Sequence, residues 1–232
     1  ELERSEKTVI NLIVGHHPIG FARPFFTDVM ELQIDLLESY GIPVNLSEPY
    51  VKEGMESIAQ MVHPSNSYDT VQAANLLDIS FMCLHTPLDN IGWRFMTDYF
   101  AEKKFYQVGD VLDAINEISE YAIMSRDFRF RPCVFAGRES NRCGKVVISG
   151  FTGGTHTSEK LYSEMVKAGI GTVIEMHCPP NYAKEAQKCH LNVIVAPHMA
   201  SDSIGFNLFL DEIENQGIRI IPCSGLIRVK RK

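Results

Sequence analysis

The sequence predicts a globular α/β fold. Short apolar runs rich in β-branched residues alternate along its 232 residues with longer stretches whose apolar residues recur at helical spacing. Hydrophobic residues make up 45% of the chain and charged residues 22%, the balance of an ordinary globular protein. The alternation pauses at an arginine-rich stretch, residues 126–142, and then resumes. We therefore expect two halves, 1–125 and 126–232, that resemble each other in structure without repeating in sequence.

In the first half, apolar runs alternate with segments of helical periodicity. Residues 25–40 space their apolar side chains one helical turn apart, and Gly41 follows where a helix commonly ends in a left-handed residue. The predicted strands are 8–14, 42–46 and 79–84, and the predicted helices are 25–40, 69–77 and 108–122.

The second half repeats the rhythm after a strand and loop within residues 126–142. Its apolar runs are short and rich in valine and isoleucine, as strands are. The predicted strands are 145–149, 172–175, 192–196 and 218–222, and the predicted helices are 158–168, 181–188 and 206–216.

The charge balance argues against several classes of partner. With 22 Lys and Arg against 29 Asp and Glu, the net charge of −7 speaks against a general nucleic-acid binder, which neutralises phosphates with basic side chains. The short basic segment 229–232 is expected only to keep the C-terminus solvated. No apolar run approaches the roughly 18–20 residues that cross a bilayer, and no signal peptide precedes the first strand, so no membrane partner is expected.

The six cysteines are scattered and form no CxxC pair, which argues against a structural zinc knuckle and against a disulfide scaffold. Cys83 lies inside an apolar run and is expected to be a small buried hydrophobe. Scattered thiols in a chain of this length favour a reducing cytoplasm as its location.

Six of the eight histidines lie at or shortly after the C-terminal end of a predicted strand. They are His16, His17, His85, His156, His177 and His198. Ligand sites in open α/β sheets form outside the carboxyl ends of the parallel strands. Histidines gathered there beside carboxylates indicate a metal site.

Two carboxylates accompany these histidines. The motif HTPLD at 85–89 has a Thr-Pro helix start, which puts Asp89 in the first turn of the helix. His198 and Asp202 are four residues apart, so a helical turn would place both on one face. Three imidazoles and two carboxylates suffice to hold two divalent cations with positions left for water. The predicted ligands are His16, His17, Asp89, His198 and Asp202.

Two interpretations stay open for the other histidines and for the arginines. His156 and His177 either support a ligand or contact substrate, or they are simply polar loop residues. His63 and His190 lie outside the pattern and are interpreted as structural or solvated. The arginines of 126–142 form either a solvated face or an anion site.

The order of these motifs resembles that of the Nif-three-like dinuclear-metal proteins, many of which are GTP cyclohydrolase I type 2 homologues. The resemblance covers nearly the whole chain, although the segment before His16 is shorter than in the family. Asp202 stands where the family has glutamate, and Glu175 or Met176 stands where it has aspartate. The motifs are HHP at 16–18, HTPLD at 85–89, GFTGG at 150–154, TVIEM at 172–176 and PHMASD at 197–202.

The resemblance implies two intertwined α/β halves with mixed sheets and a metal site at the C-terminal strand ends, in the cleft between the halves. The family's metal ligands fall on the five residues that the spacing indicated. The resemblance also implies a homohexamer whose metal sites line an inner cavity. Two divalent ions per chain are expected, and zinc, iron, manganese and nickel all suit mixed imidazole and carboxylate ligands.

Two functions compete at this point. In the first, the protein is a metal-dependent hydrolase that opens a C–N bond in a nucleotide or related small molecule, like GTP cyclohydrolase I type 2 by resemblance. Asp89 would bridge the ions and His85 or His177 would relay protons, while Arg23, Arg94 or the arginines of 126–142 would neutralise phosphates. The alternative is a non-enzymatic, metal-loaded hexameric adaptor or metal-trafficking protein, and a third possibility is a nucleotide sensor.

Overall fold

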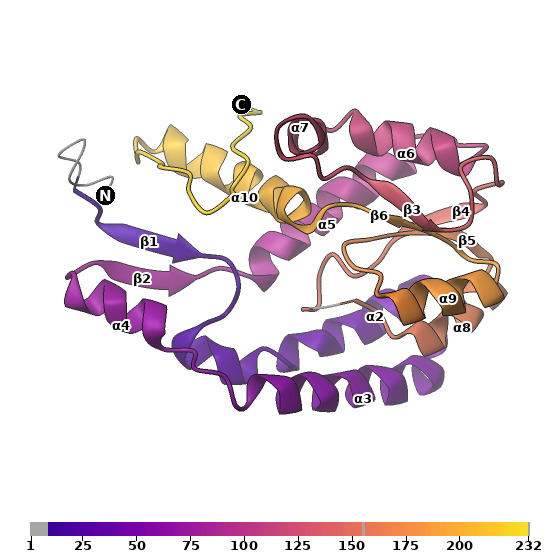
Figure 1. Ribbon diagram of the computed structural model, residues 1–232, viewed down its shortest axis with the longest axis horizontal. Helices are drawn as coiled ribbons and strands as arrows, with labels where there is room; N and C mark the ends of the chain where they lie inside the picture. The colour runs from indigo at the N-terminus through magenta and orange to yellow at the C-terminus, as the bar shows by residue number, and fades with distance from the viewer. Residues whose placement is uncertain (1–8, 155, 232) are drawn as a thin grey trace.

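The strands form two separate sheets (Figure 1) in the computed structural model, which describes residues 9–154 and 156–231. The smaller sheet pairs β1 (Leu12–Gly15) with β2 (Ser80–Cys83) in parallel. The larger sheet has the order β3-β6-β5-β4, in which β3 at one edge runs antiparallel to β6 and the other strands are parallel. The strands of this larger sheet are β3 (Cys133–Ala136), β4 (Lys145–Ile148), β5 (Ile170–Glu175) and β6 (Asn192–Val195).

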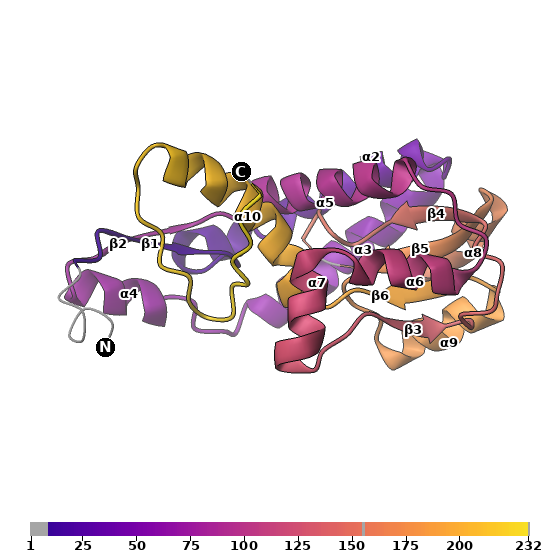
Figure 2. The same ribbon diagram turned by 90° about the horizontal axis from the view of Figure 1, so that it is seen from above.

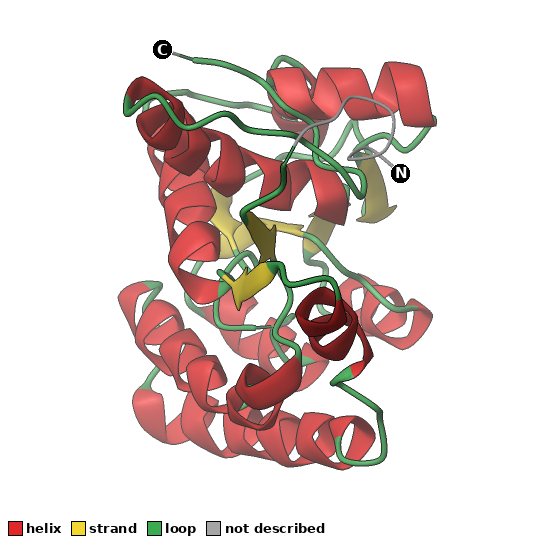
Figure 3. Ribbon diagram, turned by 90° about the vertical axis from the view of Figure 1, so that its left-hand side faces the viewer, coloured by secondary structure: helices red, strands yellow, loops and turns green. Residues whose placement is uncertain are grey.

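Helices connect the strands and enclose them on either side (Figure 3). Short 3₁₀ turns lie at Gly20–Phe25, Asp28–Glu31 and Glu159–Leu161, and a π-helical turn lies at Met124–Phe128. The α-helices are α2 (Leu32–Ser39), α3 (Val44–Val62), α4 (Asp69–Leu76), α5 (Thr86–Ala101), α6 (Val108–Asn116), α7 (Ser119–Ile123), α8 (Tyr162–Lys167), α9 (Pro180–Lys188) and α10 (His198–Asn215). Within the described ranges, no helix combines the length and apolar character needed to span a bilayer.

The alternation of side chains along the central strands divides the core into two layers. Ile148, Ile174 and Ile194 point to one face, where α5, α6, α7 and α10 cover them. The neighbouring valines of the same three strands, 147, 173 and 193, point to the opposite face, beneath α2, α3, α8 and α9. Burying each of these side chains contributes roughly 1.5–3 kcal/mol. Both layers combine residues from before and after position 125, so the two halves are intertwined as expected, and the domain boundary at 125 stays a prediction.

Most predicted elements are confirmed within one to four residues at their ends. The strand predicted for 8–14 is β1, although Thr8 lies outside the described residues. The helix predicted for 25–40 is a 3₁₀ turn followed by α2, and the one predicted for 108–122 is divided into α6 and α7. The helix predicted for 206–216 begins eight residues earlier, at His198, which brings the HxxxD motif into its first turns.

Two predicted strands are wrong. Residues 42–46 enter α3, because the backbone of Pro43 takes the extended conformation that precedes a helix and Val44 begins it. Residues 218–222 form no strand: their backbone pairs with no strand in the described chain, Ile218 is 52% exposed, and Ile220 packs against α5 and α10. Ile220 and Leu226, further along the same segment, both contact the cluster of Leu88, Phe206 and Leu210.

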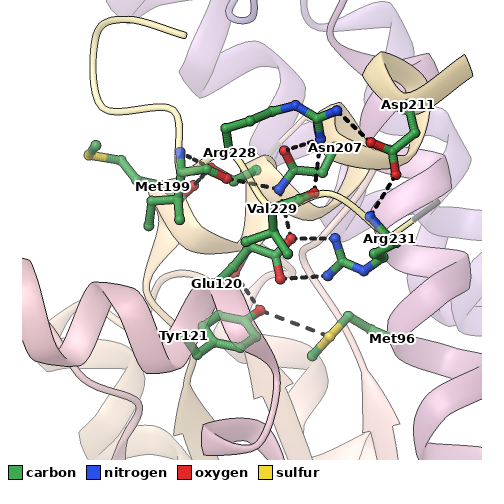
Figure 4. Close-up of polar contacts among 12 residues, drawn as sticks. Met96, Glu120, Tyr121, Met199, Asn207, Asp211, Arg228, Val229 and Arg231 are labelled. Carbon is green, nitrogen blue, oxygen red and sulfur yellow. Dashed lines mark hydrogen bonds and ion pairs between the residues drawn. The ribbon is translucent and has the colours of Figure 1, made fainter. Parts of the chain in front are cut away.

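The C-terminal segment is fastened to the core by two arginines (Figure 4). The guanidinium of Arg231 donates two hydrogen bonds, of 2.6 and 2.5 Å, to the carboxylate of Glu120, which is fully buried. Arg228 contacts Asp211 at 2.5 Å and Glu214 at 2.6 Å. Between these pairs, Asn207 donates to Glu120 at 2.7 Å and to the carbonyl of Ile227 at 2.8 Å. The expectation that segment 229–232 only keeps the C-terminus solvated is therefore wrong for Arg231.

Removing Arg231 is expected to destabilise the protein strongly, because the substitution Arg231→Ala leaves the buried carboxylate of Glu120 with the Asn207 amide as a donor but without its cationic partner. Breaking one side of such a pair costs about 3–5 kcal/mol. The matched control is Lys230→Ala, because Lys230 is 63% exposed and its pair with Glu214 is worth less than about 1 kcal/mol. Urea unfolding of both variants measures the difference, and equal free energies of unfolding would contradict this account of the tail.

Candidate metal centre

The carboxyl ends of the two sheets open onto the same cleft. His16 and His17 follow β1 directly, and His85 follows β2 at the same edge because the two strands are parallel. From the larger sheet, His177 follows β5 and His198 follows β6. The cavity between the sheets measures about 210 Å³. In Figure 1 the arrowheads of β1 and β2 point towards the side of the molecule where the larger sheet lies. The predicted gathering of histidines at strand ends is thus a feature of the fold.

The structure brings all five predicted ligands together. His16 Nε2 lies 3.1 Å from an oxygen of Asp89 and 3.4 Å from one of Asp202. The same Asp202 oxygen lies 3.1 Å from His198 Nε2 and 3.8 Å from His17 Nε2. Three overlapping groups of possible ligand atoms result among the described residues, each group within 4.8 Å: His16-His17-His85, His17-His198-Asp202 and His16-Asp89-Asp202.

The contacts in this cluster have the distances of a coordination shell and lack the angles of hydrogen bonds. His16 Nε2 and His85 Nδ1 are buried, and neither has a hydrogen-bond partner among the described residues, although carboxylate oxygens lie 3.1–3.5 Å away. Two ligand atoms about 2.1 Å from one ion, at tetrahedral or right angles, are separated by about 3.0–3.4 Å. Buried nitrogens aimed at a common point and left unpaired fit a divalent cation.

A backbone contact orients His16 for this role. Its Nδ1 lies 2.9 Å from the carbonyl oxygen of Leu84, to which it donates, so Nε2 is the nitrogen turned towards the carboxylates. Such a hydrogen bond from the rear of a ligating imidazole fixes its ring orientation. Burial alone would lower the pKa of His16, but contacts with Asp202 and Asp89 outweigh burial and raise it to about 10. In the absence of an ion, this raised pKa favours the protonated form of His16 beside the two carboxylates.

His85 and His177 lie on opposite sides of the cluster. The ring of His85 is 4.7 Å from that of His16, which adds His85 to the side chains able to hold a metal. Burial and the neighbouring imidazoles lower its pKa to about 3, so the ring is neutral and its lone pair is available.

His177 stands behind His198, with its Nε2 2.8 Å from His198 Nδ1. It therefore supports a predicted ligand, while proton relay by either histidine stays a prediction.

Helices α5 and α10 cross at the cluster, and this crossing sets the distance between its carboxylates. A Cβ atom at Gly205 of α10 would overlap the carbonyl oxygen of Leu88 on α5, and Gly92 of α5 faces the backbone of Gly205. Asp89 is adjacent to Leu88, and Asp202 lies one turn before Gly205. Only a residue without a side chain lets the two helix starts approach so closely.

The cleft also contains residues that the ligand prediction did not include. Arg23, Phe26 and Thr152 line it, together with the glycine turn at 150–154. Gln33 of α2 fastens this turn by donating to the carbonyl of Gly153 at 2.8 Å. The sequence indicates Arg23 only as one of several possible phosphate contacts, because no motif surrounds it.

The remaining candidates lie elsewhere. His63 and His190 are exposed, as expected. The ring of His156 lies 6.0 Å from that of His177 and 4.6 Å from Tyr182. Arg94 and Arg126 are surface residues whose guanidinium groups are paired with Asp98 and Asp127 respectively.

Replacing Gly205 by alanine is expected to destabilise the protein and to weaken metal binding. The added methyl group must push α5 and α10 apart, which costs about 1–3 kcal/mol even though alanine favours a helix by about 1 kcal/mol. The control is Gly54→Ala within α3, where the new Cβ would meet only the flexible end of Met30 at 3.4 Å. Unfolding and metal titration of both variants check this, and a Gly205→Ala variant as stable as Gly54→Ala would show that the crossing tolerates a side chain.

A buried glutamate beside the centre makes stability depend on pH. Burial raises the pKa of Glu175 from 4.5 to about 8, against a contact with the Tyr162 hydroxyl, which lowers it. Between these values the unfolded chain has released the proton and the folded chain retains it. Stability should therefore fall as pH rises from 5 to 8, by up to about 1.4 kcal/mol per unit from this group.

The substitution Glu175→Gln removes that titration. We expect its free energy of unfolding to decline less than that of the wild type between pH 5 and pH 8, as measured by urea unfolding at each pH. The exposed Glu102→Gln serves as control and should follow the wild type. Parallel curves for the wild type and Glu175→Gln would show that Glu175 is already ionised in the folded state.

Comparison with known proteins identifies the architecture. No family model and no curated protein sequence matches the chain. The crystal structure of a NIF3 superfamily protein from Sphaerobacter thermophilus superposes with a TM-score of 0.85 at 25% identity, over 97% of this chain and 82% of that one. Reduced HcgD from Methanocaldococcus jannaschii superposes with a TM-score of 0.47 at 15% identity, over 66% of this chain and 64% of its own.

Proposed function

We propose that this member of the NIF3 superfamily holds two divalent cations in its cleft and is a metal-dependent hydrolase of a nucleotide or related small molecule. The observation that carries the proposal is the convergence of four imidazoles and two carboxylates from both ends of the chain. Two of the buried imidazole nitrogens there have no hydrogen-bond partner in the described part of the chain. Burying polar nitrogens without a partner costs free energy, and a bound ion would offset that cost by coordinating them.

The contacts suggest how the ligands are divided. Asp202 belongs to two of the three groups of ligand atoms, and one of its oxygens lies within 3.8 Å of three imidazoles. This favours Asp202 over Asp89 as the carboxylate that both ions would share. Asp89 would then bind the ion held by His16 and His85. The partly exposed His17 and His198 would hold the second ion nearer to solvent. Zinc, iron, manganese and nickel all suit this donor set.

Bound divalent cations would supply a water of lowered pKa and would polarise the bond to be broken. The residues of the chain position the reaction. His177 holds His198 in place through the 2.8 Å contact between their rings. Burial and the neighbouring His198 and His156 lower its pKa to about 4, so the ring is neutral at pH 7. Proton relay by His177 or His85 is part of the proposal, and C–N bond hydrolysis of a purine nucleotide is the proposed reaction class.

We also propose a cellular location and an oligomeric state for the protein. All six cysteines are free, which is consistent with a reducing cytoplasm. Large apolar side chains are exposed near the two-stranded sheet, including Leu76 at 88%, Leu77 at 70% and Leu12 at 47%. Such a patch supports assembly into an oligomer, and a homohexamer is the proposed state. Light scattering on the purified protein tests it.

Metal analysis should find about two ions per chain, as a two-metal site requires. His16→Ala and Asp202→Asn are expected to lower that number, because each removes a donor shared by two of the ligand groups. The control is His63→Ala, which changes an exposed histidine outside the cleft. Elemental analysis of protein purified without an affinity column, combined with circular dichroism to confirm folding, checks all three. Two ions retained in folded His16→Ala and Asp202→Asn would refute the ligand assignment.

Hydrolysis is tested with metal-loaded protein and a panel of nucleotides, phosphodiesters and cyclic amides, including GTP with formate release as the readout. Asp202→Asn should reduce any turnover by at least about a hundredfold, as loss of a ligand that positions a catalytic metal does. Metal bound at full occupancy with no turnover of any substrate would instead support the adaptor or metal-trafficking role.

A further inference from the structure

Arg23 stands out among the residues that line the cleft. The lining contains no other arginine and no lysine. Within residues 9–154 and 156–231, no carboxylate lies within 4.0 Å of its guanidinium, whereas Arg94, Arg126, Arg228 and Arg231 all have acidic partners. Arg23 is only partly exposed, so its charge has lost some of its hydration without gaining a counter-ion.

The backbone around Arg23 is held firmly enough to present this side chain. It lies in the 3₁₀ turn Gly20–Phe25, whose first residue donates a backbone hydrogen bond of 2.6 Å to Ser67. Gly20 has a φ of +60°, and a Cβ atom there would approach Val71 to 2.9 Å, so the turn packs directly on α4. The start of α4 thus supports the position of Arg23 at the cleft.

Phe26 connects Arg23 to the metal cluster. The guanidinium carbon of Arg23 lies 5.8 Å from the centre of the Phe26 ring, and that ring lies 5.6 Å from the ring of His85. One wall of the cleft therefore runs from a cationic group, across an aromatic face, to the predicted ligands. A cation over an aromatic ring is favoured, which keeps the guanidinium on this wall.

With both metal ions bound, the charges of the cleft indicate whether it attracts an anionic or a cationic ligand. Two divalent cations exceed the charge of Asp89 and Asp202, and Arg23 adds a further positive charge. The cleft is then positive in a protein whose net charge is −7. Such a local field draws anions into the cleft. The planar guanidinium can also bind two oxygens of one oxyanion side by side.

We propose that Arg23 forms an oxyanion subsite, which holds a phosphate or carboxylate group of the substrate while the bond to be broken lies at the His/Asp cluster. Phe26 offers an apolar face between the two, suited to a planar ring. The substrate class is therefore an anionic small molecule with a ring between its anionic group and its reacting group. This inference rests on the proposed function and adds to it the chemical class of the substrate.

The experiment compares the wild type with Arg23→Gln and with the control Arg94→Gln, which removes an exposed arginine paired with Asp98. Binding of inorganic phosphate, acetate, GTP and uncharged guanosine is measured by calorimetry on zinc-loaded protein, and the zinc content of each sample is determined. Arg23→Gln should keep its zinc and its fold, bind GTP and phosphate at least about tenfold more weakly, and bind guanosine as the wild type does. Arg94→Gln should match the wild type throughout.

These measurements distinguish a phosphate ester from a carboxylate as the bound oxyanion. They also distinguish failure of the oxyanion subsite from failure of the metal centre. A loss confined to phosphate and GTP assigns the subsite to phosphate esters, and a loss confined to acetate assigns it to carboxylates. Equal affinities of the wild type and Arg23→Gln for every anion, or no anion binding by the wild type, would overturn the proposal. Zinc content below one ion per chain in the wild type would instead refute the metal centre. The same anions are then compared on metal-free protein, where an effect of Arg23→Gln would still support the subsite.

Discussion

Helices α5 and α10 touch backbone to backbone, and the position of every acidic ligand follows from that contact. Gly205 leaves room for the carbonyl of Leu88, and Gly92 faces it across the crossing. Asp89 and Asp202 therefore come within reach of one imidazole, that of His16, at 3.1 and 3.4 Å. The first turn of α5 also favours the negative charge of Asp89, because helix N-termini carry a partial positive charge. Seen from above, the two helices meet between the small sheet and the large one, and α5 then runs along the large sheet while α10 extends back over the small one (Figure 2).

The second constraint is electrostatic. Burial raises the pKa of Asp89, while contacts with His16 and His198 outweigh burial and depress the pKa of Asp202. Two ionised carboxylates that lie this close repel each other, and nearby positive charge offsets that repulsion. The raised pKa of His16 favours a protonated imidazole there in the ion-free chain, whereas divalent cations would supply more positive charge and would also coordinate the unpaired nitrogens. Arg23 adds a further positive charge at the cleft, and no carboxylate within the described chain pairs with it.

Local patterns in the sequence predicted much of this arrangement. Strand-end histidines could be recognised because parallel strands bring their carboxyl ends to one edge, and the HxxxD spacing anticipated the helical turn that places His198 beside Asp202. The chain did not reveal α3, because Pro49 and Gly54 interrupt its helical pattern, nor the role of Gly205, whose requirement arises only where two distant helices meet. The role of the C-terminal segment depends on a distant residue in the same way: Arg231 has the sequence surroundings of a solvated charge, but its partner Glu120 lies 111 residues away and is buried. His85 and Arg23 likewise acquire their places through contacts between segments far apart in sequence.

The central claim is that imidazoles and carboxylates from both ends of the chain surround a pair of cations. Anomalous diffraction from a crystal of zinc-loaded protein tests it most directly. Two peaks about 3.5–4 Å apart, enclosed by His16, Asp89, His198 and Asp202, are the predicted result. Zinc bound elsewhere, for example at the exposed Cys223, with an empty space between the tandem histidines and His198, would contradict it.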